Sequence, residues 1–273
     1  MIAIAESGSS KTDWLIIKDD QEITFQSKGY NPQFIDSNFI QNDLHSHFPE
    51  SSAIEQVFFY GAGCASASSQ DKMKNMLAEI FTSAEIEVES DLLAACRAML
   101  GHSAGIVGIL GTGSNCCYYD GKTISQKTTN LGFLMGDEGS GNNIAKRVLR
   151  KCLYNDISEH IQNDILGEAS NRNEFVTKIY NQDRINTYLA SFMKKIYPHR
   201  NDAEVAIEVK ASFSAFFKHH VAKYTESDKL YLVGSISTLF EDQLRDLSVD
   251  YNKTLVSVSK SPINGLKRHH LQG

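Results

Sequence analysis

Two glycine-rich turns lie close together near the middle of the chain. The first is G-I-L-G-T-G-S-N (Gly108–Asn115), and the second is L-G-F-L-M-G-D-E-G-S-G (Leu131–Gly141). Glycine allows the backbone to reach positive φ and to approach a ligand without a Cβ in the way. Consecutive N–H groups in such turns form concave sites for anions. The paired turns therefore predict a phosphate-binding site beside a site for a sugar or another alcohol.

A third segment, E-S-G-S-S-K-T-D (Glu6–Asp13), also has the composition of a phosphate-binding turn. Its backbone N–H groups, its hydroxyls and the charge of Lys11 suit phosphate oxygens. The carboxylate of Glu6 suits Mg²⁺, usually through water, because Mg²⁺ prefers oxygen ligands and retains several waters. The segment does not follow the P-loop pattern, and an ordinary β-hairpin turn remains an alternative for it. Its hydroxyl groups are those of Ser7, Ser9, Ser10 and Thr12.

Asp91 stands where a predicted strand gives way to a predicted helix. A carboxylate at this place either caps the helix or accepts the proton of a substrate hydroxyl at the rim of a cleft. Phosphoryl transfer to an alcohol needs positioning, charge stabilisation and a base near the nucleophile. The segment Gly136–Gly141 has a comparable alternative as an acidic helix cap, although a cap explains one carboxylate and not the glycines around it.

The composition limits the classes of partner that we expect. The chain has 273 residues, of which 22% are charged, and a formal net charge of -6. It lacks the basic tract that sequence-independent nucleic-acid binding requires. No apolar stretch approaches the roughly 20 residues of a membrane helix, and the first residues lack the features of a signal peptide. We therefore expect a cytoplasmic protein that binds neither nucleic acid nor membranes.

The spacing of the cysteines and histidines matches no motif of a zinc or iron–sulfur site within one chain. The five cysteines form no C-x-x-C pair, which disfavours a disulfide framework, a structural zinc site and an iron–sulfur cluster. The nine histidines form no H-x-x-x-H or H-E-x-x-H pattern. We interpret three histidine pairs as surface residues, namely His45/His47, His219/His220 and His269/His270.

The hydrophobic pattern predicts two similar α/β halves with a ligand cleft at their strand ends. In the first half we expect strands at 1–5, 14–17, 22–27, 57–60 and 86–89, and helices at 39–48, 71–81 and 92–100. In the second half we expect strands at 106–110, 229–233 and 255–258, a hairpin of 116–119 with 122–127, and helices at 140–153, 173–196 and 203–223.

The order of the motifs resembles that of N-acetylglucosamine kinases. These kinases belong with the BadF/BadG/BcrA/BcrD ATPases in the actin/Hsp70/sugar-kinase superfamily. The matching segments are E-S-G-S-S-K-T-D, S-D, G-I-L-G-T-G-S-N, G-F-L-M-G-D-E-G-S-G and L-V-G-S-I, and together they extend over nearly the whole chain.

The resemblance implies an α/β fold of two RNase H-like lobes, the actin-like ATPase fold, flanking a nucleotide cleft. We expect the first lobe at residues 1–105, with a C-terminal helix at about 261–273 packed on it. The second lobe is expected at residues 106–260 and carries a helical insertion. The family also implies a homodimer.

Carried over by position, the resemblance implies ATP and Mg²⁺ as cofactors and an amino sugar as the small-molecule substrate. Asp91 matches the catalytic carboxylate that contacts the accepting hydroxyl, and Glu6 would face the metal. Phosphate contacts are implied for Ser10, Lys11, Thr112 and Gly113, and adenosine contacts for Gly234 and Ser237. Sugar contacts are implied for Asn31, Ser114, Asn115, Gly132 and Asp137.

Two departures from the family pattern are present. The first turn has Ser7, Ser9 and Ser10 where many relatives have Gly-Gly-Thr, and Phe133 stands where relatives often have His or Tyr. The second departure concerns the identity of the sugar, which one or two pocket contacts can decide.

The leading hypothesis is an ATP-dependent kinase that converts N-acetylglucosamine to its 6-phosphate. Glucosamine and N-acetylmuramic acid are alternative substrates, and a non-catalytic sugar sensor on the same fold is an alternative function. A further alternative is an ATPase that activates a radical dehydratase through an iron–sulfur cluster shared by a dimer. The adjacent placement of Cys116 and Cys117 suits that alternative poorly.

Overall fold

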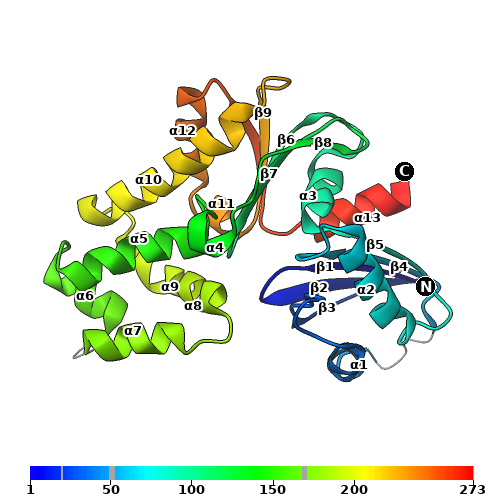
Figure 1. Cartoon of the computed structure of the whole chain (residues 1–273). Coiled ribbons are helices and arrows are strands. Elements are labelled where there is room, and N and C mark those ends of the chain that lie inside the picture. Colours follow the sequence, from blue (N-terminus) through cyan, green and yellow to red (C-terminus); the bar gives the residue numbers. More distant parts are fainter. Residues whose placement is uncertain (20, 49–52, 168–170, 273) are drawn as a thin grey trace. The chain divides into compact units, whose positions relative to one another are not determined.

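The computed structural model describes residues 1–19, 21–48, 53–167 and 171–272. The chain divides into two compact units (Figure 1). Unit 1 comprises Met1–Ser103 and Ser261–Gly273, and unit 2 comprises Ala104–Lys260. Each unit contains one five-stranded mixed sheet. None of the described helices combines the length and the apolar composition of a membrane span.

The sheet of unit 1 has the strand order β3-β2-β1-β4-β5. Strands β1 (Ile2–Ser7), β2 (Lys11–Lys18) and β3 (Gln21–Lys28) form an antiparallel meander. Strands β4 (Gln56–Gly61) and β5 (Glu85–Ser90) continue the sheet parallel to β1.

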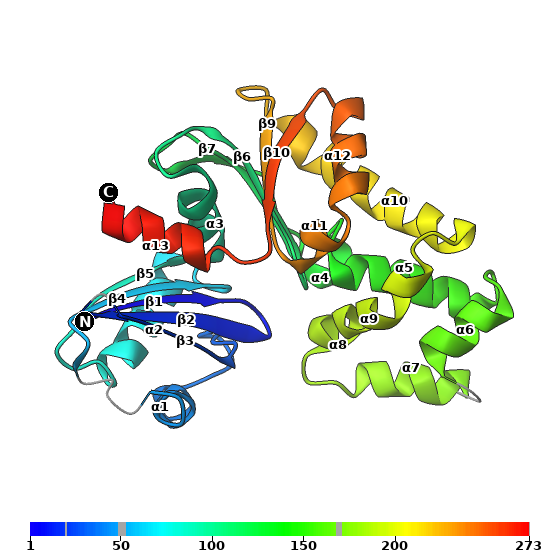
Figure 2. The ribbon, with the colours of Figure 1, turned by 180° about the vertical axis from the view of Figure 1, so that it is seen from behind.

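Side chains of β1 alternate between two apolar layers. Ala3 and Ala5 face a layer built with α1 (Ser37–His45) and α2 (Ala67–Ala78). Ile4 faces the opposite layer, built with α3 (Asp91–Leu100) and α13 (Ile263–Gln272) (Figures 1 and 2). Because successive strand residues point to opposite faces, one short apolar strand supplies both layers.

The sheet of unit 2 repeats this topology with the order β10-β9-β6-β7-β8. Strands β6 (Gly105–Leu110), β7 (Ser114–Tyr119) and β8 (Ile124–Lys127) form the antiparallel meander. Strands β9 (Lys229–Val233) and β10 (Thr254–Ser259) are parallel to β6. The shared order of strands makes each unit an RNase H-like domain, as the family resemblance implies.

Helices of unit 2 bury one large apolar core. Helices α5 (Gly141–Tyr154), α10 (Ala203–His219), α11 (Ser235–Leu239) and α12 (Glu241–Asp250) contribute to the core, and so do the helices of the insertion described next. A helical insertion lies between α5 and α10 in the chain. It consists of α6 (Glu159–Leu166), α7 (Arg172–Tyr180), α8 (Ile185–Ser191), α9 (Met193–Ile196) and the 3-10 helix η2 (Tyr197–His199). The short helix α4 (Gly132–Met135) and the 3-10 helix η3 (Val221–Lys223) complete the unit.

The structure differs from the helix predictions at several places. The single helix expected at 173–196 is wrong, because α7 ends at Tyr180, where Asn181 caps it, and the chain restarts as α8 and α9. Helix α2 begins at Ala67 rather than at 71, because Ser66 and Ser69 form a capping box. The helices α6 and α12 were not predicted. Their described surfaces are mostly polar, and α12 buries only Leu244, Leu247 and Ser248.

Helix α13 packs closely on α3. A Cβ at Gly265 would lie 2.3 Å from the carbonyl oxygen of Ala98, so glycine is required for this separation between the two helices. Leu266 is fully buried beside Ala94 and Ala98, against β1 and β2. The last helix therefore completes the apolar layer that covers one face of the first sheet.

Replacing Leu266 should test this contribution. Leu266→Ala is expected to lower the free energy of unfolding by about 2–5 kcal/mol, because it opens a cavity in a layer that cannot collapse around it. Leu271→Ala, at an exposed position of the same helix, should change it by less than about 0.5 kcal/mol. Urea denaturation of both variants measures the difference, and equal losses would contradict the assignment.

His270 of α13 is held as a neutral ring. It stacks on Phe58 with a centroid distance of 3.8 Å, and its Nε2 lies 2.8 Å from the Tyr60 hydroxyl. Arg97 donates to the same hydroxyl oxygen at 2.6 Å, so the Tyr60 proton is available for Nε2. Burial, together with the neighbouring His269, lowers the pKa of His270 from 6.5 to about 4.

The pKa of His270 predicts a pH dependence of stability. Between pH 6.5 and pH 4, His270 is protonated in the unfolded state but stays neutral in the folded state. The free energy of unfolding therefore falls as the pH falls through this window. The loss assigned to His270 is on the order of 1–3 kcal/mol. Urea denaturation across this range should show a smaller loss for His270→Gln than for wild type. The exposed control His45→Gln should follow wild type, and parallel curves for all three proteins would contradict the assignment.

Candidate functional site

The carboxyl ends of three parallel strands meet at one edge of the first sheet. Ser7 of β1 is in register with Gly61 of β4, which is in register with Ser90 of β5. Asp91 follows at once as the first residue of α3. Because ligands of α/β proteins bind outside the carboxyl ends of parallel strands, this edge is the natural place for the chemistry predicted in unit 1.

Carboxylates crowd together at this edge. Glu6 of β1 lies opposite Asp13 of β2. Burial, followed by the negative charges of Asp91 and Asp13, raises the pKa of Glu6 from 4.5 to about 8, against the opposing effect of Lys11. Oxygen ligands with an excess of negative charge are the donor set that a divalent cation such as Mg²⁺ prefers. The residues present therefore fit the metal that the family resemblance implies.

Asp91 does not act as the helix cap. Ser90 occupies the N-cap position of α3, and its side chain accepts a hydrogen bond from the backbone N–H of Leu93 at 3.2 Å. The alternative interpretation of Asp91 as a cap is therefore wrong. Its carboxylate lies in the first turn of α3, where it acts electrostatically on both Glu6 and Cys64.

The hydroxyl groups of the turn between β1 and β2 differ in their surroundings. The hydroxyl of Ser7 accepts from the backbone N–H of Tyr30 at 2.8 Å and from the hydroxyl of Thr12 at 2.8 Å. Both side chains are fully buried, so they fasten the turn to the next loop instead of facing phosphate. Ser10 and Lys11 remain exposed, and the Lys11 amine is 2.9 Å from an Asp13 carboxylate oxygen.

Asn31 lies beside the loop that follows β4. Its Oδ1 accepts from the backbone N–H of Gln33 at 3.0 Å, and it would lie 2.6 Å from a Cβ at Gly63. Gly63 has φ of +90°, so glycine is needed there on both grounds. The contact places Asn31 next to the loop that leaves the carboxyl end of β4.

The two glycine-rich turns of unit 2 are joined through Asp137. One carboxylate oxygen of Asp137 accepts from the Ser114 backbone N–H at 3.3 Å, and the other accepts from the Asn142 side-chain amide at 2.8 Å. A Cβ at Gly113 would lie 2.8 Å from that second oxygen. Asp137 is buried and has φ of +55°. The structure thus brings Gly113, Ser114 and Asp137 into one cluster.

Asn142 is the residue of this cluster that sequence reasoning missed. It is fully buried, and its amide also donates to the Thr112 carbonyl at 2.6 Å. Its Oδ1 has no hydrogen-bond partner among the described residues. An asparagine in the first turn of a helix is usually a solvated or capping residue, so the sequence alone gave no signal for it.

The first backbone N–H groups of α5 form hydrogen bonds within the protein. Ser140 is the N-cap, so the acidic cap proposed for this turn is wrong. The N–H groups of Gly141 and Asn142 donate to the carbonyls of Gly111 and Thr112 at 2.8 and 3.2 Å. These hydrogen bonds fix the loop at Gly111 and Thr112 against α5.

Gly132 and Asn115 lie on either side of the same cluster. Gly132, with φ of +67°, donates its N–H to the Asn130 side chain at 2.7 Å, and Asn130 donates to the Ser114 carbonyl at 2.8 Å. Asn115 is half-buried, and its Oδ1 accepts from the Cys116 N–H at 3.1 Å. Asn130 thus ties Gly132 to Ser114.

Gly234 lies where β9 meets α11. Its φ is +123°, and a Cβ there would lie 2.3 Å from the Leu110 carbonyl oxygen. Ser237 is fully buried and donates its hydroxyl to the Gly234 carbonyl at 2.8 Å. In this arrangement Ser237 positions Gly234 and presents no atom to solvent.

The expectation that His220 is a surface residue is wrong. Its ring is buried, with Nδ1 at 2.7 Å from the Thr128 hydroxyl and Nε2 at 3.2 Å from Glu138. The pairing joins α10 to the second glycine-rich turn and keeps Glu138 away from the helix cap. Sequence spacing could not show it, because the partners are 82 and 92 residues away along the chain.

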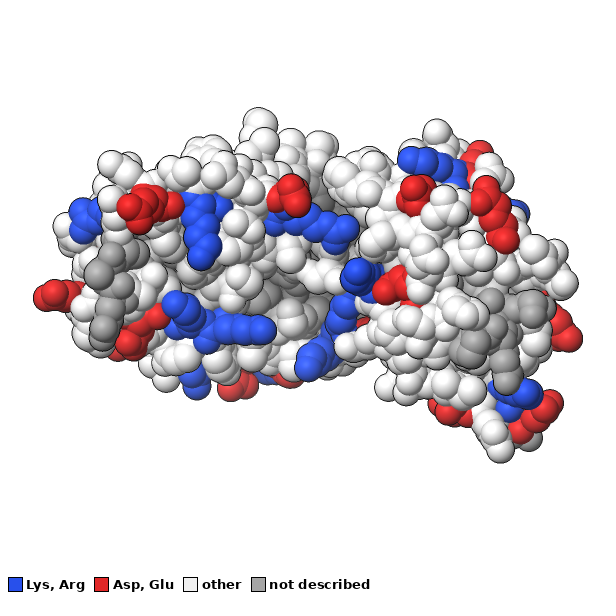
Figure 3. Space-filling model, turned by 90° about the horizontal axis from the view of Figure 1, so that it is seen from below, with Lys and Arg blue, Asp and Glu red and all other residues white. Residues whose placement is uncertain are grey.

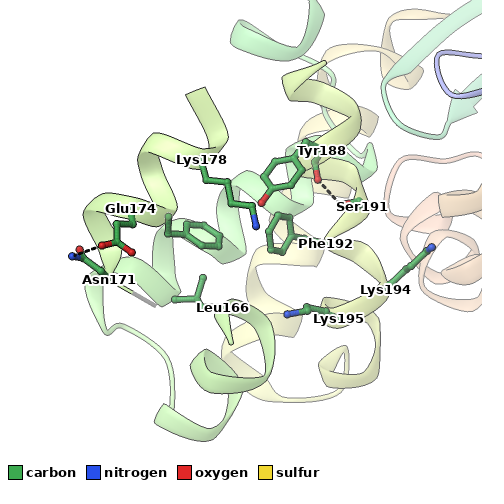
Figure 4. Close-up of a pocket in the computed structure, with 10 residues that line it drawn as sticks. Leu166, Asn171, Glu174, Lys178, Tyr188, Ser191, Phe192, Lys194 and Lys195 are labelled. Atoms are coloured by element: carbon green, nitrogen blue, oxygen red, sulfur yellow. Dashed lines mark hydrogen bonds between the residues drawn. The ribbon is translucent and has the colours of Figure 1, made fainter. Parts of the chain in front are cut away.

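A separate cavity lies within the helical insertion (Figure 4). It has a volume of about 660 Å³ and contains none of the predicted site residues in its lining. Phe175 and Phe192 form part of its wall, together with three lysine side chains. On the face of the molecule shown in Figure 3, lysine and arginine side chains are mixed with acidic ones.

Comparison with solved structures identifies the family. A structure from Porphyromonas gingivalis, named provisionally as an N-acetylglucosamine kinase, matches with a TM-score of 0.93 and 33% sequence identity over 100% of both chains. The chain belongs to the N-acetylglucosamine kinase family. Comparisons with models of protein families and with curated proteins give no match.

More distant structures share the fold of this family. A Chromobacterium violaceum protein with the same provisional name matches at TM-score 0.71 and 15% identity, over 97% of this chain and 96% of its own. A glucokinase of the ROK family from Streptomyces griseus, in complex with glucose and AMPPNP, matches at 0.59 and 14%, over 97% and 96%. The fold is therefore that of the actin-like ATPases and sugar kinases.

A matched pair of glycine variants tests the contact between Gly113 and Asp137. Gly113→Ala should lower the free energy of unfolding by about 1–3 kcal/mol, because Asp137 is buried, held by two hydrogen bonds, and must move. Gly111→Ala should change it by less than about 0.5 kcal/mol, because no atom lies within 4 Å of a Cβ there. Urea denaturation measures both, and equal stability would show that Asp137 moves without cost.

Proposed function

We propose that the protein is an ATP-dependent kinase that phosphorylates N-acetylglucosamine to its 6-phosphate. The observation that carries the proposal is the position of Asp91. It starts a helix at the carboxyl edge of the sheet and acts electrostatically on the half-buried Glu6. The chain also matches, over its full length, a structure named provisionally for this activity.

Asp91 is the group that we assign to the chemical step. Phosphoryl transfer to an alcohol asks the protein for alignment, charge stabilisation and a base that accepts the hydroxyl proton. A carboxylate at the edge of the sheet suits this last task, and ATP, when bound, supplies the phosphoryl group. Glu6 would hold Mg²⁺ through water, and the clustered negative charge around it supports this role.

The remaining predicted residues divide into nucleotide and sugar contacts. Ser10 and Lys11 are exposed on the first turn and can approach phosphate. The loop of Thr112 and Gly113 is the second phosphate segment, and Gly234 borders the adenosine with Ser237 holding it in place. The proposed sugar contacts are Asn31, Ser114, Asn115, Gly132 and Asp137.

The clustered carboxylates at this edge of the sheet help to distinguish a kinase from a non-catalytic sugar sensor. The charges of Asp91 and Asp13 raise the pKa of Glu6, which reduces folding stability, and such strain is typical of catalytic sites. A non-catalytic sugar sensor does not need this electrostatic strain. The acidic edge therefore favours the kinase.

Phosphate transfer to a panel of sugars tests the proposal. N-acetylglucosamine, glucosamine and N-acetylmuramic acid are supplied with Mg²⁺ and ATP, and N-acetylglucosamine is expected to give the highest kcat/KM. Asp91→Asn should lower kcat by about 10²–10⁴-fold, as expected for loss of a general base, while sugar binding measured by calorimetry persists. Asp71→Asn, at an exposed acidic position of unit 1, is the matched control and should keep wild-type activity.

Two outcomes would overturn the proposal. If wild type transfers phosphate to no amino sugar but binds one, the protein is a sensor. If Asp91→Asn is as active as wild type, another group accepts the proton.

A further inference from the structure

Two histidines and two aspartates converge in the helical insertion of unit 2. His160 and Asp164 stand four residues apart on α6, His199 ends η2, and Asp202 immediately precedes α10. One ligand atom from each of His160, His199 and Asp202 lies within 4.8 Å of the other two. The cluster is separate from all the residues of the proposed kinase site, and it joins segments about 40 residues apart in the chain.

His199 is held between two carboxylates. Its Nδ1 lies 3.1 Å from a carboxylate oxygen of Asp202, and its Nε2 lies 3.2 Å from one of Asp164. A neutral imidazole carries one N–H and one lone pair, so one of these two nitrogens would direct a lone pair at an anionic oxygen. A positive ion at that nitrogen, either a proton or a metal, removes the repulsion.

His160 makes a metal the more suitable ion. Its ring lies edge-on to that of His199, with a centroid distance of 6.1 Å, and offers a second imidazole nitrogen to the same point. A proton on His199 gives His160 no role there, whereas a transition metal binds both rings. Two imidazole nitrogens and one carboxylate are a donor set for Zn²⁺ and similar ions, whereas Mg²⁺ and Ca²⁺ prefer oxygen ligands alone.

Asp164 supplies the partner that metal-bound histidines usually have. A ligating histidine almost always donates its other ring N–H to a carboxylate, a carbonyl or water, which fixes its tautomer and orientation. With Nδ1 directed at the ion and Asp202, Nε2–H of His199 is directed at Asp164. The carboxylates are 66% exposed at Asp164 and 42% at Asp202, so an ion can enter from solvent.

We propose that His160, His199 and Asp202 form a binding site for Zn²⁺ or a related transition-metal ion, with Asp164 as the positioning residue for His199. The bound ion joins α6 to the segment that leads into α10. A second contact already ties these elements, because the hydroxyl of Ser158 donates to the carboxylate of Glu204 at 3.4 Å. The ion therefore stabilises the insertion and takes no part in phosphate transfer.

Calorimetric titration of the full chain with Zn²⁺ tests the proposal. The titration uses protein prepared without a histidine tag. Excess Mg²⁺ is present to occupy sites that consist of oxygen ligands alone. Wild type is expected to bind one Zn²⁺ per chain, and Zn²⁺ at about 100 times its Kd should raise the melting temperature by about 5–10 °C. Co²⁺ in place of Zn²⁺ should give the visible absorption of a low-symmetry site with nitrogen ligands.

Variants locate the ion. His160→Ala changes an exposed helix position, and Asp202→Ser keeps a residue suited to precede a helix, so both should fold, as circular dichroism will show. Both should lose the Zn²⁺ site and the increase in melting temperature. Asp164→Asn should weaken binding by about 10–100-fold.

Two controls separate this site from the rest of the molecule. His45→Gln removes an exposed histidine of unit 1, and Asp91→Asn alters the acidic edge, so both should still bind one Zn²⁺. The proposal is overturned if wild type binds no Zn²⁺, or if folded His160→Ala and Asp202→Ser bind it as tightly as wild type.

Discussion

The register of β1, β4 and β5 is the constraint on which the first unit depends. Parallel pairing places Ser7, Gly61 and Ser90 side by side, so the three chain segments leave the sheet at the same edge. Glu6 and Asp91, 85 residues apart, then act on each other's charge. The repulsion between them is sustained because the apolar layers on both faces of the sheet hold the strands in place. Carboxylates that bind a cation or accept a proton bind it more strongly when a second negative charge is held close to them.

Close backbone packing has the corresponding role in the second unit. Glycine at 113 leaves room for the Asp137 carboxylate, and glycine at 234 leaves room for the Leu110 carbonyl. Asn142 then bonds both Thr112 and Asp137, so the two turns form one rigid cluster. Several glycines that first indicate contact with a ligand are thus also required by contacts within the protein. The two requirements are compatible, because a loop must be held firmly to present its remaining N–H groups to a ligand.

Sequence patterns were reliable where the local signal and the tertiary structure agree. The apolar run predicted as a strand at 1–5 and the hairpin predicted for 116–119 with 122–127 correspond to strands of the structure. Polar helices such as α12 were missed, because they bury few side chains and carry little periodic signal. His220 was misplaced for a related reason. A histidine near a helix end is usually exposed, and only its contacts with Thr128 and Glu138 make it an interior residue.

The sequence by itself determined the resemblance to the family, the two α/β halves and the short list of polar residues on tight turns, because motif order and hydrophobic periodicity are properties of the chain alone. The tertiary structure alone decided which of these residues face inward. Ser7, Thr12 and Ser237 bond within their own unit, whereas Ser10 and Lys11 stay exposed. It also decided that His160, His199 and Asp202 converge. The spacing of these residues along the chain does not predict that they meet, because their meeting depends on how the helices pack.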